Sequence, residues 1–125
     1  MGLYYVSEEA CLEERTELVE VDPGSYFLLR PGETCHVSTE EMVTLPDNIC
    51  GWLEGRSRFA RLGLTVHSTA GFVQPGTSNR PVLEVTNTGP LNLCIPPGVA
   101  LCQIIFEECK GSATYNGRFR AQVRP

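Results

Sequence analysis

Positive charge and hydroxyl groups gather in one short stretch, "EGRSRFARLGLTVHSTAGF", residues 54–72. A glycine that leads into a helical turn exposes backbone N–H groups and the positive end of the helix dipole, a combination that suits an anion such as a phosphate. Arg56, Ser57 and Arg58 follow Gly55 and would add charge-assisted and hydroxyl hydrogen bonds. The pattern therefore predicts an anion site, although an exposed capped turn with solvated arginines has the same residues.

Glu84 and His67 are two further side chains with acid-base chemistry. In "VLEVTN" (82–87), Glu84 shares a strand face with Val82 and Thr86. On a solvated face it is an ordinary surface carboxylate. On a face that lines a pocket it becomes a candidate proton carrier. His67 in "TVHSTA" poses the same choice between a structural hydrogen bond and a role in a site.

The C-terminal segment 110–125 changes character and becomes polar, basic and rich in turn residues. Tyr115, Arg118 and Gln122 give it an aromatic and basic composition that suits an arm closing over a ligand. The same composition is compatible with an exposed tail.

Turn signals separate the apolar runs that must position these side chains. Pro-Gly pairs and similar turn sequences recur at short intervals, and between them lie runs rich in Val, Ile, Leu, Tyr and Phe, which is typical of an all-β sandwich or barrel. The predicted strands are 17–21, 25–30, 34–45, 49–55, 64–68, 81–87, 91–95 and 99–108. One short helix is predicted over 57–63, where Phe59 and Leu62 share a face.

Length and composition limit the classes of protein to consider. A chain of 125 residues forms one domain, 1–125. A net charge of −5 argues against nucleic-acid binding, and the sequence shows neither a membrane span nor a secretory signal, so we expect a cytoplasmic protein. The six cysteines are irregularly spaced, mostly within apolar runs, and no C-x-x-C is present. We therefore expect reduced, mostly buried thiols and no zinc site.

Four motifs occur in a characteristic order: "GRSRFARLGLTVHSTA", "QPG", "LEVTN" and "PPGVALCQ". They resemble the hallmarks of the dCTP deaminase branch of the dUTPase superfamily, which are G-R-S-S-x-A-R-x-G-L-x-x-H-x-T-A, a Pro-Gly turn, L-E-x-x-N and P-G-x-x-I-x-Q. The tail "YNGRFRAQ" is similar to the family's closing Y-x-G-K-Y-x-x-Q element. The resemblance implies a distorted jelly-roll-like β-barrel of the dUTPase type, assembled as a homotrimer with nucleotide sites between subunits.

The resemblance also implies an activity, the metal-independent deamination of dCTP to dUTP and ammonia. Glu84 would activate a water and shuttle its proton, and the backbone carbonyl of Ala70 would hold that water. Arg56 and Ser57 would bind the triphosphate, and Arg61 with Ser57 would organise the reacting centre. Mg²⁺ would be bound through the triphosphate, without zinc, and dTTP is a candidate inhibitor. The implied nucleotide-binding set is Arg56, Ser57, Arg58, His67, Thr69, Gln74, Tyr115, Arg118 and Gln122.

Three departures from the family pattern keep alternatives open. Gln74 stands where the family has Asp, and an amide cannot act as a base, which argues against a further step to dUMP. Thr77 replaces the Trp or Phe that packs on the deoxyribose, and the family's N-terminal helix and D-x-R-L-G strand are not found before Tyr4. The alternatives are a dUTP or dCTP diphosphatase, including a dUMP-forming bifunctional enzyme, and a catalytically inactive trimeric nucleotide-binding module.

Overall fold

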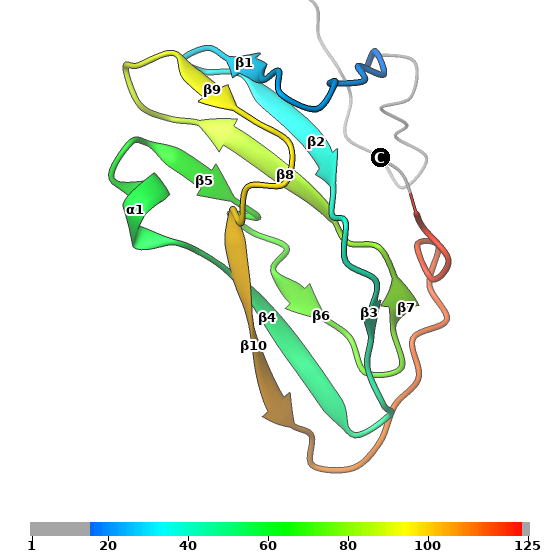
Figure 1. Ribbon diagram of the computed structural model, residues 1–125. Helices are drawn as coiled ribbons and strands as arrows, with labels where there is room; N and C mark the ends of the chain where they lie inside the picture. Colours follow the sequence, from blue (N-terminus) through cyan, green and yellow to red (C-terminus); the bar gives the residue numbers. More distant parts are fainter. Residues whose placement is uncertain (1–15, 124–125) are drawn as a thin grey trace, which may run out of the picture.

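Short strands and one helical turn make up the fold in the computed structural model, which describes residues 16–123 (Figure 1). The elements in chain order are β1 (Phe27–Leu29), β2 (Thr34–Ser38), β3 (Val43–Thr44), β4 (Ile49–Gly55), α1 (Ser57–Ala60), β5 (Leu64–Val66), β6 (Phe72–Val73), β7 (Ser78–Asn79), β8 (Val82–Asn87), β9 (Leu93–Ile95) and β10 (Cys102–Glu108). The predicted all-β fold with one short helix is therefore confirmed.

The strands pair antiparallel in small sheets, in the orders β1-β9, β10-β4-β6, β2-β8-β5 and β3-β7. Figure 1 shows β1, β9, β2, β8 and β5 at one end of the molecule, with the long β4–β10 pair running toward the other end, where β6, β3 and β7 lie. The strand β8 is the centre of its sheet, so its side chains have neighbours on both sides.

The hydrophobic core packs against one face of β8. Burial alternates along this strand, with Leu83 and Val85 buried and Val82, Glu84 and Thr86 half-buried. The alternation follows from the two-residue period of a strand, and it leaves Glu84 on the face away from the core. The core cluster consists of Leu29, Leu64, Val66, Leu83, Val85 and Leu101.

Asn87 is a fully buried polar residue at the end of β8. Its amide nitrogen donates to the carbonyls of Leu29 (3.0 Å) and Leu91 (2.7 Å), and its amide oxygen accepts from the Gly89 backbone N–H (3.0 Å). A buried amide is tolerated only when it is paired in this way. Asn87 therefore ties β1 and the turn before β9 to the central strand.

The helix α1 is shorter than predicted, because regular helix ends at Ala60 and a turn follows. Gly63 has a φ of 89° in that turn, and a Cβ at this position would overlap the backbone of Gly89. Only glycine combines this conformation with such a close approach. The turn fixes the path from α1 into β5.

One predicted strand is absent and another is divided in two, while others, such as 91–95 and 99–108, are shorter than predicted. Residues 17–21 form no strand, and Leu18 and Val19 are 67% and 55% exposed, because no neighbouring strand pairs with them. The predicted strand 34–45 is divided into β2 and β3 by a bend in which the Thr39 hydroxyl donates to the Glu41 carbonyl (2.8 Å). The short strands β6 and β7 were not predicted, since two-residue strands leave no periodic pattern.

The C-terminal arm, residues 110–123, runs from the end of β10 back along β3 and β7 (Figure 1). Backbone hydrogen bonds hold it: Ala113 donates to Asp47 (2.8 Å), and Tyr115 donates to Pro75 (3.0 Å). The arm is thus bound to the body of the same chain. No helix among residues 16–123 has the length and hydrophobicity that crossing a bilayer requires.

Candidate functional site

A cavity of about 510 Å³ lies between the outer face of β8, the segment after β5 and the C-terminal arm. Seven of the predicted site residues line it, namely His67, Ala70, Gln74, Glu84, Tyr115, Arg118 and Gln122. They come from three segments that are distant in the sequence, so the fold brings together one part of the predicted set.

Glu84 lies between the two histidines of the chain, because all three occupy one row across the sheet. The register of β2 and β8 places His36 directly opposite Glu84. On the other side, Val66 pairs with Val85, and the His67 N–H donates to the Glu84 carbonyl (2.9 Å), which places His67 opposite Glu84. His36, His67 and Glu84 all line the cavity.

His36 and Glu84 are a non-hydrogen-bonded pair of the antiparallel β2–β8 ladder, the kind of pair whose side chains lie close together. The backbone hydrogen bonds of this ladder join Asn87 N to Glu33 O (3.0 Å) and Thr39 N to Pro81 O (3.0 Å). Counting in steps of two from these bonded positions makes 36 and 84 a non-hydrogen-bonded pair, in which side chains approach most closely. The imidazole of His36 is therefore a wall of the cavity next to the carboxylate.

Both ring nitrogens of His67 have partners on β8. Nε2 donates to the carbonyl of Val82 (3.0 Å), and Nδ1 lies 2.6 Å from Oε2 of Glu84. The imidazole is 9% exposed and the carboxylate side chain 44% exposed. Oε2 of Glu84 is thus paired with His67, and the Glu84 side chain still reaches the cavity.

The arm closes the cavity on the side opposite β8. The Asn79 amide donates to the carbonyl of Phe119 (3.0 Å), and the Arg80 N–H donates to the carbonyl of Gln122 (3.1 Å). The Tyr115 hydroxyl accepts from the Phe119 N–H (3.2 Å), and a Cβ at Gly117 would overlap the tyrosine ring. These contacts set Tyr115, Arg118 and Gln122 over the cavity as one folded turn.

The residues predicted to bind phosphate lie elsewhere. Arg56, Ser57, Arg58 and Arg61 belong to α1 or flank it, and they do not line the cavity, nor does Thr69. Arg56 donates to the carbonyl of Ala100 (3.1 Å), so part of its guanidinium has a structural role. The remaining four residues are exposed. Within one chain, the predicted phosphate site and the cavity with Glu84 are therefore separate.

Several cavity residues were absent from the predicted site, namely His36, Phe72, Thr77, Asn79 and Phe119. His36 is separated from Glu84 by many residues, and only strand register brings the two together. Register depends on the whole sheet and is not readable from local spacing. Thr77 is 5% exposed and belongs to the cavity wall.

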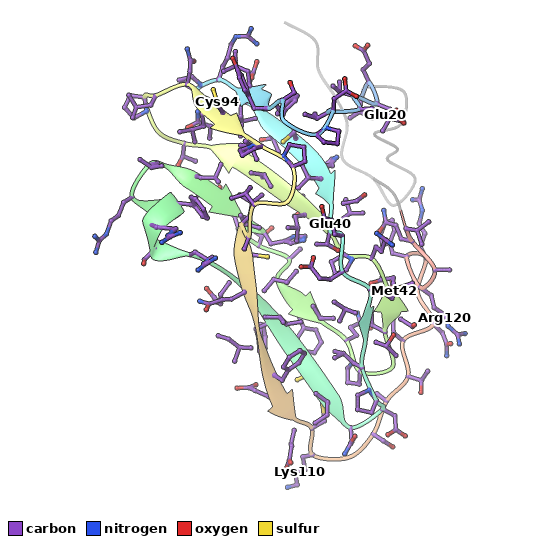
Figure 2. All side chains as sticks on the ribbon, in the orientation of Figure 1. Glu20, Glu40, Met42, Cys94, Lys110 and Arg120 are labelled. Atoms are coloured by element: carbon purple, nitrogen blue, oxygen red, sulfur yellow. The ribbon has the colours of Figure 1, made fainter. Side chains whose placement is uncertain are left out.

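A second cavity of about 360 Å³ lies between residues 37–43 and residues 98–104. Its lining is mostly apolar, with Glu40 and Glu41 at its rim; Glu40 is labelled in Figure 2. None of the predicted site residues lines it, so the candidate site is the larger cavity.

The arrangement of these strands has counterparts among solved structures, which define the class of fold. The chain is similar to the native EIAV dUTPase, with a TM-score of 0.61 and 22% identity over 74% of this chain and 75% of that one. It is also similar to a mutant dUTPase from phage phi11 of S. aureus, with a TM-score of 0.60 and 16% identity over 90% and 92% of the two chains. The fold is that of the dUTPases.

Sequence comparison then narrows the class to one family. The model of the family described as dCTP deaminase-like matches residues 4–109, and the chain belongs to this family. It is 47% identical over 108 residues to a dCTP deaminase of Tolumonas auensis, covering 85% of this chain and 56% of that protein. It is 42% identical over 119 residues to a dUMP-forming dCTP deaminase of Beutenbergia cavernae, covering 90% and 62%. The chain thus spans about three fifths of the length of these relatives.

Proposed function

We propose that the chain deaminates dCTP to dUTP and ammonia, with Glu84 as the group that carries protons. One observation supports this most directly: the Glu84 carboxylate reaches a cavity that Ala70 and Gln74 also line, while His67 fixes one of its oxygens. Relatives that share nearly half of their aligned residues with this chain are dCTP deaminases. A cytoplasmic location goes with the proposal.

The proposed reaction needs two proton transfers, and one carboxylate can perform both in turn. A water held by the Ala70 carbonyl attacks C4 of the cytosine, and Glu84 takes its proton and passes it to N3. Glu84 then takes the proton of the new C4 hydroxyl and gives it to the amino group, which leaves as ammonia and leaves a C4 carbonyl. The two protons of the water thus end on N3 and on ammonia, and Glu84 returns to its charged form.

The triphosphate half of the proposed site comes from a second copy of the chain. Ser57 on α1 and Arg61 directly after it are exposed and lie outside the cavity of their own chain. An apolar row of three side chains leads from the cavity to the surface. Phe72 lines the cavity and packs on Trp52, with ring centroids 4.9 Å apart. Ile105 on β10 is paired with Trp52 and ends the row. These three side chains are 42–48% exposed, a large apolar area for a sheet face. We propose that a homotrimer covers this row and brings a neighbour's α1 to the cavity.

Magnesium enters the proposal only with the substrate. No three His, Cys, Asp or Glu side chains in the described part of the chain are grouped as metal ligands. Mg²⁺ is commonly held by substrate phosphates and waters rather than by a cage of protein ligands, and the exposed hydroxyl and guanidinium groups around α1 suit such a complex. The phage phi11 dUTPase has a structural Mg(II) ion.

The reaction is proposed to stop at dUTP. Gln74 lines the cavity and offers an amide, which cannot take a proton from a second water. Relatives of both kinds exist, some named dCTP deaminase and some dUMP-forming, and the amide at position 74 is our reason for placing this chain with the first kind. We propose dTTP as an inhibitor that occupies the same cavity.

The test is a product assay on the purified protein with dCTP, CTP and dUTP in separate reactions containing Mg²⁺. We expect dUTP and ammonia from dCTP, without dUMP. Glu84→Gln removes the proton carrier and should lower kcat by about 100-fold or more while dCTP still raises the Tm. Cys94→Ser, on β9 and remote from the cavity, is the matched control (Figure 2). If wild-type protein leaves all three nucleotides intact while dCTP still raises the Tm, the chain is a nucleotide-binding module instead.

A further inference from the structure

His67 has an unusual backbone conformation. Among the non-glycine residues in 16–123, it alone has a positive φ, 47°. For a residue with a bulky side chain this left-handed conformation is unfavourable, and it persists only where surrounding contacts impose it. Backbone strain of this kind clusters at functional sites.

Three hydrogen bonds to β8 hold His67 in that conformation. They are the backbone bond to the Glu84 carbonyl (2.9 Å), the Nε2 bond to the Val82 carbonyl (3.0 Å) and the contact of Nδ1 with Oε2 of Glu84 (2.6 Å). The first two bonds hold the imidazole in the orientation that brings Nδ1 to Oε2 of Glu84. The imidazole cannot rotate to serve a ligand in the cavity without giving up two partners.

The proton count of this contact follows from the partners of the ring. A carbonyl oxygen only accepts, so Nε2 carries a hydrogen. A neutral imidazole would then present a bare Nδ1, and two acceptors do not approach to 2.6 Å. One more proton therefore lies between Nδ1 and Oε2. Imidazole is intrinsically a stronger base than a carboxylate, which favours an imidazolium paired with a carboxylate.

We propose that His67 is a positioning residue that stays protonated and holds Oε2 of Glu84, so that Oε1 alone exchanges protons with water and substrate. This inference rests on the proposed deaminase function and deepens it. The two other bonds of His67 to β8 keep the ring in place while Oε1 takes up and gives back each proton. It assigns His67 to the carboxylate and not to nucleotide binding.

Other titratable or charged groups line the same cavity, and they too bear on how the His67–Glu84 contact depends on pH. They are His36 on β2, directly opposite Glu84, and Tyr115 and Arg118 on the arm. His36 and His67 are the chain's two histidines, so a spectrum of labelled histidine contains only these rings.

The first test reads the proton directly and needs no substrate. Protein with ¹⁵N-labelled histidine is examined by NMR at pH 7, and His36→Gln assigns the two rings. We expect both ring nitrogens of His67 to be protonated in the wild type, and Nδ1 to lose its proton in Glu84→Gln. A neutral His67 with a bare Nδ1 in both proteins would overturn the proposal. This result stands even if the wild type shows no deaminase activity, in which case only the proposed function fails.

The second test uses His67→Gly, because glycine adopts the positive φ without strain and the variant should fold. We expect kcat for dCTP to fall about 100-fold with KM within about threefold of wild type, the pattern for loss of a group that acts in the transition state. Added imidazole should restore part of kcat, which a merely structural role does not predict. His67→Asn, which also tolerates a positive φ, should be equally slow and insensitive to imidazole. An unchanged kcat in either variant, or a rise in KM alone, would contradict the proposal.

Discussion

We propose that Gln74 limits this chain to the first of the two reactions named among its relatives. It is exposed to the cavity and shares it with Glu84, so any second water near the substrate would meet an amide there. An amide donates and accepts hydrogen bonds but takes up no proton at neutral pH. The chemistry at this position is therefore open to a gain-of-function test.

Gln74→Asp should add a dUMP-forming step. A carboxylate at this position can act as a general base, which contributes roughly 100-fold or more to a hydrolytic step. We expect dUMP and diphosphate to appear with dCTP or dUTP as substrate, measured by chromatography of the nucleotides. Gln74→Asn keeps the amide and serves as the control. The interpretation fails if the wild type already forms dUMP, or if Asp and Asn at this position give the same products.

The thiols differ sharply in exposure, which gives a second prediction at this scale. In the described part of the chain Cys94 is exposed, whereas Cys50 is buried and Cys35 and Cys102 are half-buried. Burial raises the pKa of Cys35, Cys50 and Cys102, and Glu33 adds to the effect at Cys35. The reactive thiolate is therefore scarce at these three residues at pH 8.

Alkylation at pH 8 should modify Cys94 first, at least about tenfold faster than Cys35, Cys50 or Cys102. Peptide mass spectrometry after timed exposure to iodoacetamide separates the sites, including Cys11, which lies outside the described residues. Raising the pH toward 10 should narrow the difference, since deprotonation then reaches the buried thiols. Equal rates at pH 8 in the folded protein would contradict the burial on which the prediction rests.

At the scale of elements, β8 connects the core to the cavity. Its buried side chains pack inward, its alternate side chains include Glu84, and Asn87 ends it with three side-chain hydrogen bonds to the neighbouring segments. The position of Glu84 therefore depends on how firmly the end of the strand is held.

Asn87→Ala should destabilise the fold by about 3 kcal/mol, because the buried carbonyl of Leu29 loses its donor and the partly buried bond to the Leu91 carbonyl is also lost. Urea unfolding at a fixed protein concentration measures the change. The control is Thr88→Ala, which removes one exposed hydrogen bond to the Gly63 carbonyl (2.9 Å) and should cost below about 1 kcal/mol. Similar losses for both variants would show that the buried network is not what holds the strand.

The sequence was most informative where a strand is long and one face is buried. The predicted range 49–55 coincides with β4, and the predicted face of Glu84 agrees with the burial alternation of β8. Prediction failed where tertiary contacts decide: residues 17–21 lack a pairing strand, the Thr39 bend divides 34–45, and β6 and β7 are too short to leave a pattern.

Part of the predicted residue set lines one cavity, and the geometry of that cavity could not be read from the sequence. Motif resemblance selected Glu84, Ala70 and Gln74, which share the cavity, but local spacing could not place His36 beside Glu84 or show the His67 contact. Both facts come from strand register, which is a property of the sheet. Their roles stay predictions until they are tested.

At the scale of the whole molecule, the two halves of the proposed site lie in different places on one chain. The acid-base half lies in the cavity with Glu84, and the phosphate half lies on the exposed side of α1 with Ser57 and Arg61. If neighbouring subunits join them, a subunit that is defective in one half can still supply the other half. Mixed oligomers therefore test the arrangement without a structure of the complex.

Glu84→Gln and Ser57→Ala should each be inactive alone and regain activity when co-expressed in equal amounts. With random assembly, half of the sites take their α1 from the Glu84→Gln subunit, and half of those take their carboxylate from the Ser57→Ala subunit. About a quarter of wild-type activity should thus return. Separately purified proteins mixed without subunit exchange are the control and should stay inactive. A site made within one chain would give no recovery at any ratio, because every chain then carries one defective half; recovery near a quarter requires that α1 of one copy meet Glu84 of another.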